Sequence, residues 1–317
     1  NDEDRGHVFG TLRLPMTSTD APGLLRGKRL IVFGAGYVGG ELARQAVVAG
    51  ARVTVLTRNA EKARALSTGG MDTVLDDLAG DDWHRRMEGG ADFVVNCVSG
   101  GGAGIDGYRR SYREGMESMT RWLRERGGAG AILYTSSTSL YPQSGGARVN
   151  EAAPVDREHE RPRILAETED LLMALPAAAG RRTVLRLAGI YGPGRHHLLE
   201  QVRSGEVAGR GDHHLNLIHR DDICRAIRAV LLSTEPGRAD GEVFNVADDG
   251  AAPKADVVYW LAEKLGLPKP VFTGAPATGR RAVTPDRIIE NAKIKRVLGW
   301  APVYPGFREG YAAILGA

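Results

Sequence analysis

The chain has 317 residues, 42% of them hydrophobic and 26% charged, a composition that supports a packed globular core and excludes wholesale disorder. Its 42 Lys and Arg against 39 Asp and Glu leave a net charge of +3, too small a bias to predict binding to nucleic acid. No apolar run approaches the roughly 18 residues that a membrane span needs, and the two cysteines, Cys97 and Cys224, have no CxxC partner. We therefore expect a cytoplasmic protein without disulfides and without a membrane or nucleic-acid partner.

Residues 1–26 show no sustained periodicity and are expected to form an N-terminal extension. From residue 27 onward, short apolar runs alternate with helical stretches, which predicts a parallel sheet covered by helices on both faces. The strands expected from these runs are 29–33, 52–56, 72–75, 93–98, 131–135 and 183–187. The sequence thus predicts an α/β protein with a doubly wound parallel sheet, a Rossmann fold, over 27–190. A small C-terminal substrate lobe over 191–317 is expected to be interwoven with that sheet.

Two further features refine this organisation. Beyond residue 190 the strand-like pieces 215–218 and 243–246 separate helical stretches at 222–232 and 254–265. Between the fourth and fifth strands, an apolar stripe recurs at helical spacing, and it is expected to pack in the core or at a homodimer interface. Its members are Tyr108, Tyr112, Met116, Met119 and Leu123.

A glycine-rich turn follows the first expected strand and opens a helix, as the dinucleotide-binding fingerprint requires. It reads Gly34-Ala-Gly36-Tyr37-Val38-Gly39. Gly34 permits the tight turn, Gly36 lets the backbone approach a diphosphate, and Gly39 lets helix and strand pack closely. The amides at the start of the helix, Tyr37 and Val38 included, then present N–H groups to the anion.

The end of the second expected strand indicates which dinucleotide is bound. It reads Thr57-Arg58-Asn59, where an NAD site usually places an acidic residue for the ribose 2′-hydroxyl. The planar guanidinium of Arg58 suits a 2′-phosphate instead, and Thr57 and Asn59 are expected to add hydrogen bonds. The sequence therefore favours NADP(H) over NAD(H).

Seven segments in a fixed order carry a family resemblance, among them YTSSTSLY at 134–141 and LRLAGIYGPGR at 185–195. The others are 34–39, 77–78, 216–223, 242–248 and 298–300. Together they resemble the extended short-chain dehydrogenase/reductase family, and more closely its atypical branch of NAD-dependent epimerase/dehydratase-like proteins. The resemblance runs over nearly the whole chain outside the N-terminal extension.

This resemblance implies roles for particular residues. Asp77 and Leu78 would lie against the adenine, and the residues that line the ribose and diphosphate would be Cys97, Val98 and Ser99. Ser137 matches the catalytic Ser/Thr that hydrogen-bonds the substrate oxygen, and 187–191 would lie near the nicotinamide. Asp222 matches a structural acid at a helix start, where Asp221 or Asp222 is also a suitable N-cap.

The family's acid/base pair, however, is missing. That pair is a tyrosine followed four residues later by a lysine, whose charge helps to lower the tyrosine pKa. It should fall at the start of the helix that includes 169–172. The chain has no tyrosine between Tyr141 and Tyr191 and no lysine between Lys62 and Lys254.

Several side chains could stand in for this pair. Depending on the register, Arg161 or His159 occupies the tyrosine position, but an arginine cannot act as a base near neutral pH. His159 titrates in that range, and Tyr141 or Tyr191 would serve if the fold brought either to the nicotinamide. The candidate catalytic residues are therefore Ser137, Tyr191, Tyr141 and His159.

The histidine pairs 196–197 and 213–214 are not predicted to bind metal. Adjacent histidines point in different directions, and their spacings match no zinc pattern. His196 or His197, with Arg195, is instead expected to contact an anionic substrate.

The sequence thus predicts an NADP(H)-dependent oxidoreductase of the short-chain dehydrogenase/reductase type that acts on a small or sugar-like carbonyl or alcohol. Two alternatives stay open. One is a sugar-nucleotide epimerase or dehydratase that uses its bound cofactor for internal redox. The other is a non-catalytic NADP(H)-binding regulatory protein, which the missing tyrosine and lysine would fit.

Overall fold

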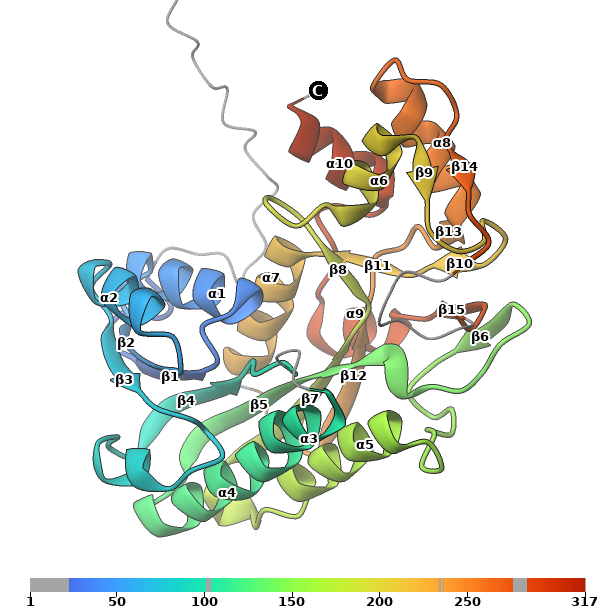
Figure 1. Cartoon of the computed structure of the whole chain (residues 1–317). Coiled ribbons are helices and arrows are strands. Elements are labelled where there is room, and N and C mark those ends of the chain that lie inside the picture. Colours follow the sequence, from blue (N-terminus) through green and yellow to red (C-terminus); the bar gives the residue numbers. More distant parts are fainter. Residues whose placement is uncertain (1–22, 101–103, 234, 236, 276–283, 317) are drawn as a thin grey trace, which may run out of the picture.

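A seven-stranded parallel sheet forms the centre of the molecule (Figure 1). The computed structural model describes residues 23–100, 104–233, 235, 237–275 and 284–316, so the predicted extension lies outside it except for residues 23–26. The strand order is β12-β7-β5-β4-β1-β2-β3, and each pairing is parallel. The strands are β1 (Arg29–Phe33), β2 (Arg52–Thr57), β3 (Asp72–Leu75), β4 (Ala91–Asn96), β5 (Ala129–Ser137), β7 (Arg181–Leu187) and β12 (Glu242–Val246).

The sequence located all six strands that it assigned to this sheet, with shifts of at most two residues at their ends. The seventh, β12, was expected in the C-terminal lobe, but it pairs with β7 at the edge of the central sheet. The chain therefore leaves the sheet after β7, builds one part of the lobe, returns to the sheet at β12, and builds the rest of the lobe from the residues that follow. Because of this return, no single boundary at residue 190 separates sheet from lobe.

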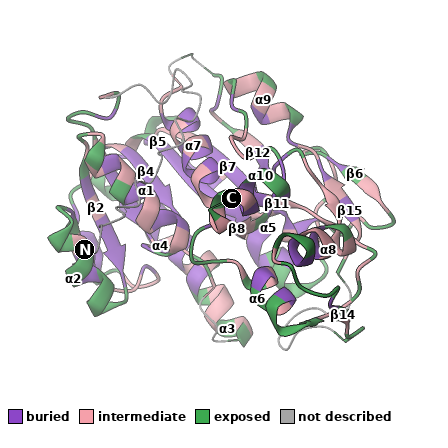
Figure 2. Ribbon diagram, turned by 90° about the horizontal axis from the view of Figure 1, so that it is seen from above, coloured by how far each residue is buried: buried purple, intermediate pink, exposed green. Residues whose placement is uncertain are grey.

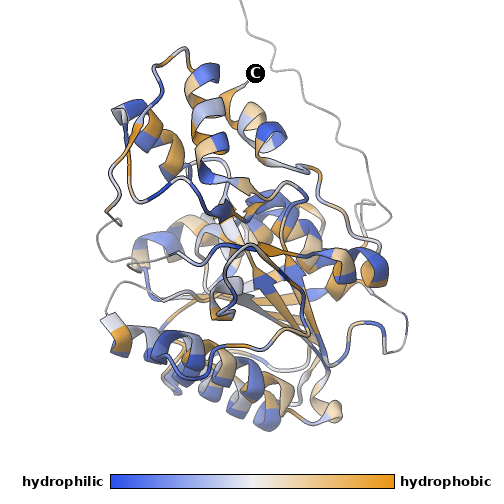
Figure 3. Ribbon diagram, turned by 90° about the vertical axis from the view of Figure 1, so that its right-hand side faces the viewer, coloured by the Kyte–Doolittle hydropathy of each residue, from blue (hydrophilic) through white to orange (hydrophobic). Residues whose placement is uncertain are grey.

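Helices cover both faces of the sheet, as the alternating pattern predicted. Residues of α1, α2 and α7 pack on one face and residues of α4 and α5 on the other. Figure 2 shows buried strands between helices that expose only their outer sides. Figure 3 shows that the strands are mostly apolar and that the helices carry polar residues as well. The helices are α1 (Tyr37–Val48), α2 (Ala60–Thr68), α3 (Gly104–Arg109), α4 (Gly115–Arg126), α5 (Glu160–Met173), α7 (Arg220–Leu231) and α9 (Ala292–Leu298). Single 3-10 turns occur at Asp82–Arg85, Thr138–Leu140 and Ala177–Ala179.

A smaller lobe stands over the carboxyl ends of the strands and has its own apolar cluster (Figure 1). Helices α6 (His197–Ser204), α8 (Lys254–Lys264) and α10 (Phe307–Leu315) supply most of this cluster. Four two-stranded pairs link the lobe internally and to the sheet domain. These are β8 (Gly189–Tyr191) with β11 (Leu217–His219), β10 (His214–Leu215) with β13 (Ala252–Pro253), β9 (Glu206–Val207) with β14 (Val271–Phe272), and β6 (Ala147–Val149) with β15 (Arg287–Ile289).

The predicted apolar stripe is divided by a π-helical turn, Arg110–Glu114, between α3 and α4. Met116, Met119 and Leu123 are buried in the core as expected. Tyr108 and Tyr112 are only partly buried. A π turn holds one residue more than an α turn, so it changes the direction in which the preceding side chains point.

The start of α7 differs from the expected N-cap. His219 is the cap, and its ring nitrogen accepts the N–H of Asp221 at 3.3 Å. Asp222 lies in the first turn, where it is fully buried and accepts the backbone N–H groups of Val303 and Tyr304 at 2.7 and 3.0 Å. Asp222 therefore fastens the C-terminal segment to α7, which agrees with a structural acid but not with an N-cap.

Three further observations concern disulfides, membrane spans and metal sites, which the sequence did not predict. Both Cys97 and Cys224 are buried and free. Within the described ranges, no helix combines the length and the apolar character that crossing a bilayer requires. Nor do three or more His, Cys, Asp or Glu side chains come together there in a way that would hold a metal ion.

Candidate active site

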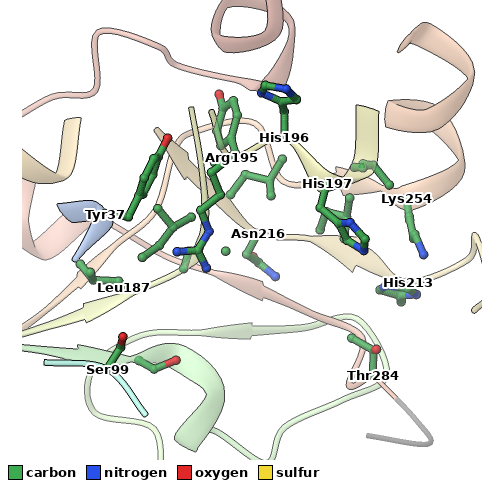
Figure 4. A pocket seen from close by; sticks show the side chains of 18 of the residues that line it. Tyr37, Ser99, Leu187, Arg195, His196, His197, His213, Asn216, Lys254 and Thr284 are labelled. Atoms are coloured by element: carbon green, nitrogen blue, oxygen red, sulfur yellow. The ribbon is translucent and has the colours of Figure 1, made fainter. Parts of the chain in front are cut away.

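A cavity of about 960 Å³ lies between the carboxyl ends of the strands and the lobe. Ligands of doubly wound sheets bind at this edge. The sheet domain contributes Gly36 and the segment 97–100, and the lobe contributes polar side chains of α6, the 208–217 segment and α8. Figure 4 shows Arg195 projecting into this space, with Tyr37 and Ser99 on one side and His197, His213 and Lys254 on the other.

The glycine turn has the geometry of a diphosphate cradle. Gly34 has a φ of +88°, and a side chain there would meet the backbone of Val98 at 2.8 Å. A Cβ on Gly39 would lie 2.2 Å from the Gly34 carbonyl oxygen, whereas a Cβ on Gly36 would meet nothing within 4 Å. Gly36 lines the cavity and starts α1 without a side-chain cap or an acidic residue in the first turn of that helix. The amides at the start of α1 are therefore exposed to an anion placed in the cavity.

Tyr37 connects this turn to the lobe. Its hydroxyl donates to the Pro193 carbonyl oxygen at 2.9 Å. The guanidinium groups of Arg195 and Arg220 lie 5.5 and 5.1 Å from the centre of its ring. Tyr37 and Val38 both line the cavity, as expected for residues of the cofactor turn.

The residues expected at the 2′-position lie beyond the cavity, at the carboxyl ends of β2 and β3. The Arg58 side chain is 51% exposed and 3.7 Å from the Asp77 carboxylate, which also accepts from Arg110 at 2.9 Å. Burial raises the pKa of Asp77, but the N–H of Ala79 and the two guanidinium groups outweigh this and lower it.

The other residues predicted there have structural partners. The Asn59 side chain caps α2 by accepting the Lys62 N–H at 2.9 Å, and the Thr57 hydroxyl accepts the Asn59 N–H at 3.3 Å. Leu78 is 3% exposed in the core. Of the two charged groups at this position, Arg58 is thus the more exposed.

The segment after β4, where the resemblance implies contact with the ribose and diphosphate, forms part of the cavity wall. Cys97, Val98 and Ser99 all line the cavity. Burial raises the pKa of the Cys97 thiol to about 12, so this cysteine stays protonated and does not act as a nucleophile near neutral pH.

Ser137 ends β5 at the cavity and is half-buried. Its hydroxyl oxygen accepts the Ser139 N–H at 3.1 Å, which leaves the hydroxyl proton able to point to a ligand. Beneath it, Ser136 donates to the buried Glu169 at 2.5 Å, and Glu169 pairs with Arg186 at 2.6 Å. This ion pair fixes the end of β5 from behind.

The other three predicted catalytic residues are directed away from the cavity space. The Tyr141 hydroxyl is buried, donating to Asn245 at 2.9 Å and accepting from Arg186 at 2.8 Å. Tyr191 lines the cavity, but its hydroxyl turns away to donate to the Gly306 carbonyl oxygen at 3.4 Å. The His159 side chain is 79% exposed and bound to Asp156 at 2.8 Å. Since none of the three presents a proton to the cavity, we do not assign the acid/base role to them.

Some cavity residues were not singled out in the sequence. On the sheet side Tyr112 lines the cavity, although its helical spacing suggested packing. On the lobe side Arg210, Asn216 and Lys254 join the predicted Arg195, His196 and His197. Only the fold reveals these groups, because short lobe segments bring them together from distant parts of the chain.

The chain was compared with known proteins. Residues 30–247 match the model of the NAD dependent epimerase/dehydratase family. The chain is 30% identical to Protein YeeZ of Escherichia coli (strain K12) over 285 residues, 88% of this chain and 97% of YeeZ.

Solved structures share the architecture. A functionally unknown conserved protein from Silicibacter pomeroyi DSS is 26% identical with a TM-score of 0.72, covering 91% of this chain and 98% of its own. MoeE5, solved with UDP-glucose and NAD, has the same fold at 22% identity and a TM-score of 0.76, covering 91% and 97%. The present chain has the glycine turn and the Rossmann sheet, and it matches the family model over most of its length. It therefore belongs to the NAD-dependent epimerase/dehydratase family, as an enzyme that uses a nicotinamide dinucleotide.

Proposed function

We propose that this chain is an NADP(H)-dependent oxidoreductase acting on the carbonyl or alcohol carbon of a small or sugar-like substrate. The observation that carries the proposal is that one cavity joins Gly36 of the phosphate turn to Ser137 and to the lobe. Its volume of about 960 Å³ is at the upper end of the range for ligand pockets, about 300–1,000 Å³. That is room for part of a dinucleotide with a small substrate beside it.

The charge at the end of β2 supports the phosphorylated cofactor. The Arg58 guanidinium lies 3.7 Å from the Asp77 carboxylate, which Arg110 also contacts at 2.9 Å, and about half of the Arg58 side chain is left exposed. A 2′-phosphate would be attracted there, and the exposed fork of Arg58 suits its oxygens.

The dinucleotide, when bound, supplies or accepts a hydride at its nicotinamide ring. The amides at the start of α1 would hold the diphosphate, and the Ser137 hydroxyl would donate its hydrogen to the substrate oxygen. Leu187 and Ala188 form part of the wall between these groups and restrict the access of water.

A second candidate is internal redox on a sugar nucleotide, as in epimerisation or dehydration. Arg195, Arg210 and Lys254 line the cavity together with two carboxylates, Asp286 and the Asp212 that pairs with Arg210. The remaining excess of positive charge favours an anionic substrate. The family match and the likeness to MoeE5, which was solved with UDP-glucose, support the same candidate.

Calorimetry followed by a turnover assay tests both. We expect the full chain to bind NADPH at least about tenfold more tightly than NADH, a difference of about 1.4 kcal/mol. We then expect NADPH to be consumed with one member of a panel of aldehydes, ketones and nucleotide-linked keto sugars. Conversion of a sugar nucleotide without net loss of cofactor would select the second candidate. Binding without any turnover would contradict both.

A further inference from the structure

Reduction of a carbonyl needs a proton for its oxygen, and the helix where the family keeps its acid does not supply one here. In one register α5 offers Arg161 and the buried Leu165, and in the other it offers His159 and Arg163. Arginine does not donate a proton near neutral pH, and His159 is bound to Asp156 on the surface. The proton donor must therefore come from another element.

Among the described residues, four tyrosines line the cavity: Tyr37, Tyr112, Tyr191 and Tyr311. The hydroxyls of Tyr37 and Tyr191 donate to carbonyl oxygens of the chain. Tyr311 is 2% exposed and packs on the Tyr191 ring in the lobe cluster. Tyr112 remains, on the sheet side of the cavity that Ser99 and Ser137 also line.

The surroundings of Tyr112 fit a proton donor. The backbone N–H of Gly100 favours the ionised form of its hydroxyl and so acts to lower its pKa, and the hydroxyl proton can be given to a ligand. The Arg161 guanidinium lies 5.3 Å from the centre of the Tyr108 ring, which is itself 4.5 Å from the Tyr112 ring. This guanidinium favours the ionised form of Tyr112, which is the effect that the family obtains from its lysine.

The π-helical turn explains why a tyrosine of this helix reaches the cavity. Tyr112 is the middle residue of Arg110–Glu114, and the core residues Met116 and Met119 follow it. In a continuous α-helix, residues four apart would share one face. The extra residue of the π turn changes the direction of Tyr112, which is only partly buried, packs at the border of both apolar clusters and lines the cavity.

We propose that Tyr112 is the catalytic acid of the proposed reaction and that Arg161 is its positioning residue. The inference rests on the proposed function and names the proton donor of the same site. In reduction, a hydride from the reduced dinucleotide forms the new C–H bond, and the π electrons of the carbonyl move to oxygen. That oxygen takes the proton of the Tyr112 hydroxyl, and water reprotonates the phenolate. Alcohol oxidation is the reverse.

Three features set the protonation of Tyr112. Burial raises its pKa above the ordinary value, and the Gly100 N–H and the charge of Arg161 oppose that rise. Tyr134 on β5 is a titratable neighbour whose own pKa burial raises, and the Tyr108 ring on α3 lies 4.5 Å from the Tyr112 ring. The acid form is therefore present at neutral pH, and reduction should be lost as the pH rises through the pKa of the phenol.

Matched tyrosine variants test the catalytic role. General acid catalysis contributes about 10²–10⁴-fold, so Tyr112→Phe should lower kcat by about 100-fold or more and leave NADPH affinity within a few-fold. Tyr108→Phe, which keeps the ring beneath Arg161 and lies outside the cavity lining, should retain wild-type turnover. Loss of activity in both variants, or in neither, would overturn the assignment.

The role of Arg161 has a readout that needs neither cofactor nor substrate. In an ultraviolet titration of the apo protein, the tyrosinate signal absent from Tyr112→Phe belongs to Tyr112. Arg161→Gln should move the midpoint of that signal to higher pH, whereas Arg161→Lys should keep the midpoint near its wild-type pH. An unchanged titration in Arg161→Gln would contradict the pairing. A wild type that binds NADPH but reduces no carbonyl would contradict the proposed function instead, so the two failures are distinguishable.

Discussion

Arg58 is the residue on which the cofactor preference depends. Its fork is half exposed at the end of β2, with Asp77 at 3.7 Å. A charge-assisted hydrogen bond contributes about 1.5–3 kcal/mol, so Arg58→Ala should weaken NADPH binding by roughly 10- to 150-fold and leave NADH binding nearly unchanged. Calorimetry with both dinucleotides measures this.

Arg52 provides the matched control, because it begins β2 at the amino end, whereas Arg58 follows the carboxyl end of that strand. Arg52→Ala should bind NADPH like the wild type. If Arg58→Ala weakened both dinucleotides equally, the 2′-phosphate assignment would be wrong.

Asp248 makes stability depend on pH. It is 5% exposed, and one carboxylate oxygen accepts the Gly250 N–H at 3.1 Å. The other oxygen has no hydrogen-bond partner in the described part of the chain. Burial raises the pKa of this carboxyl from 3.8 to about 8.

Because the folded state holds this proton more tightly, the stabilisation is complete below about pH 4 and is lost as the pH rises through 8. The slope in this window is at most about 1.4 kcal/mol per pH unit. Asp248→Asn should therefore gain stability over the wild type at about pH 9 relative to about pH 5 in urea unfolding. The exposed Asp82→Asn serves as control, and an equal pH dependence in Asp248→Asn and wild type would refute the assignment.

At the scale of elements, the strand–turn–helix unit of β1 and α1 contains one glycine that packing requires, Gly39, and one that cofactor binding requires, Gly36. A Cβ on Gly39 would lie 2.2 Å from the Gly34 carbonyl oxygen, a backbone atom that cannot turn aside. Gly39→Ala should therefore destabilise the protein by about 1–3 kcal/mol, the usual cost of overpacking.

Gly36 is the matched position in the same turn. A Cβ there would meet nothing within 4 Å and would project into the cavity. Gly36→Ala should fold with wild-type stability and bind NADPH more weakly. Thermal unfolding and calorimetry of both variants test this. If Gly36→Ala lost stability and Gly39→Ala did not, the two roles would be assigned wrongly.

The elements that could be predicted are those that the sheet buries on both faces. Continuous apolar runs mark β1 to β5 and β7, and the glycine spacing marks the start of α1. The lobe strands have two or three residues, too few for any period to show. The expected strand 215–218 is interrupted at Asn216, whose side chain bonds to Arg287 and Ile289 of β15. Such long-range bonds leave no local pattern.

The candidate site divides in the same way. The phosphate turn and Arg58 follow from local spacing, whereas the wall at Cys97–Ser99 and Ser137 follow from the family resemblance. Tyr112 was attributed to packing, because nothing in its spacing announces a π turn. The lobe cations Arg210 and Lys254 come from segments whose proximity only the fold decides.

At the scale of the whole molecule, the sheet supplies the cofactor site and the lobe supplies the other half of the cavity. The chain passes from β7 into the lobe through β8, and it returns through β11 and α7 to the edge strand β12. Because the lobe interrupts the sheet in sequence, neither part is a separable domain.

Tyr37 has a consequence for the order of events. One side chain joins the phosphate turn to Pro193 and lies beside Arg195, a residue of the substrate half of the cavity. A dinucleotide bound at the turn therefore also fixes, through Tyr37, the position of Arg195 in the substrate half of the cavity. We expect compulsory-order kinetics with the dinucleotide entering first and leaving last, which product-inhibition patterns would reveal; random entry would mean that the two halves of the cavity act independently.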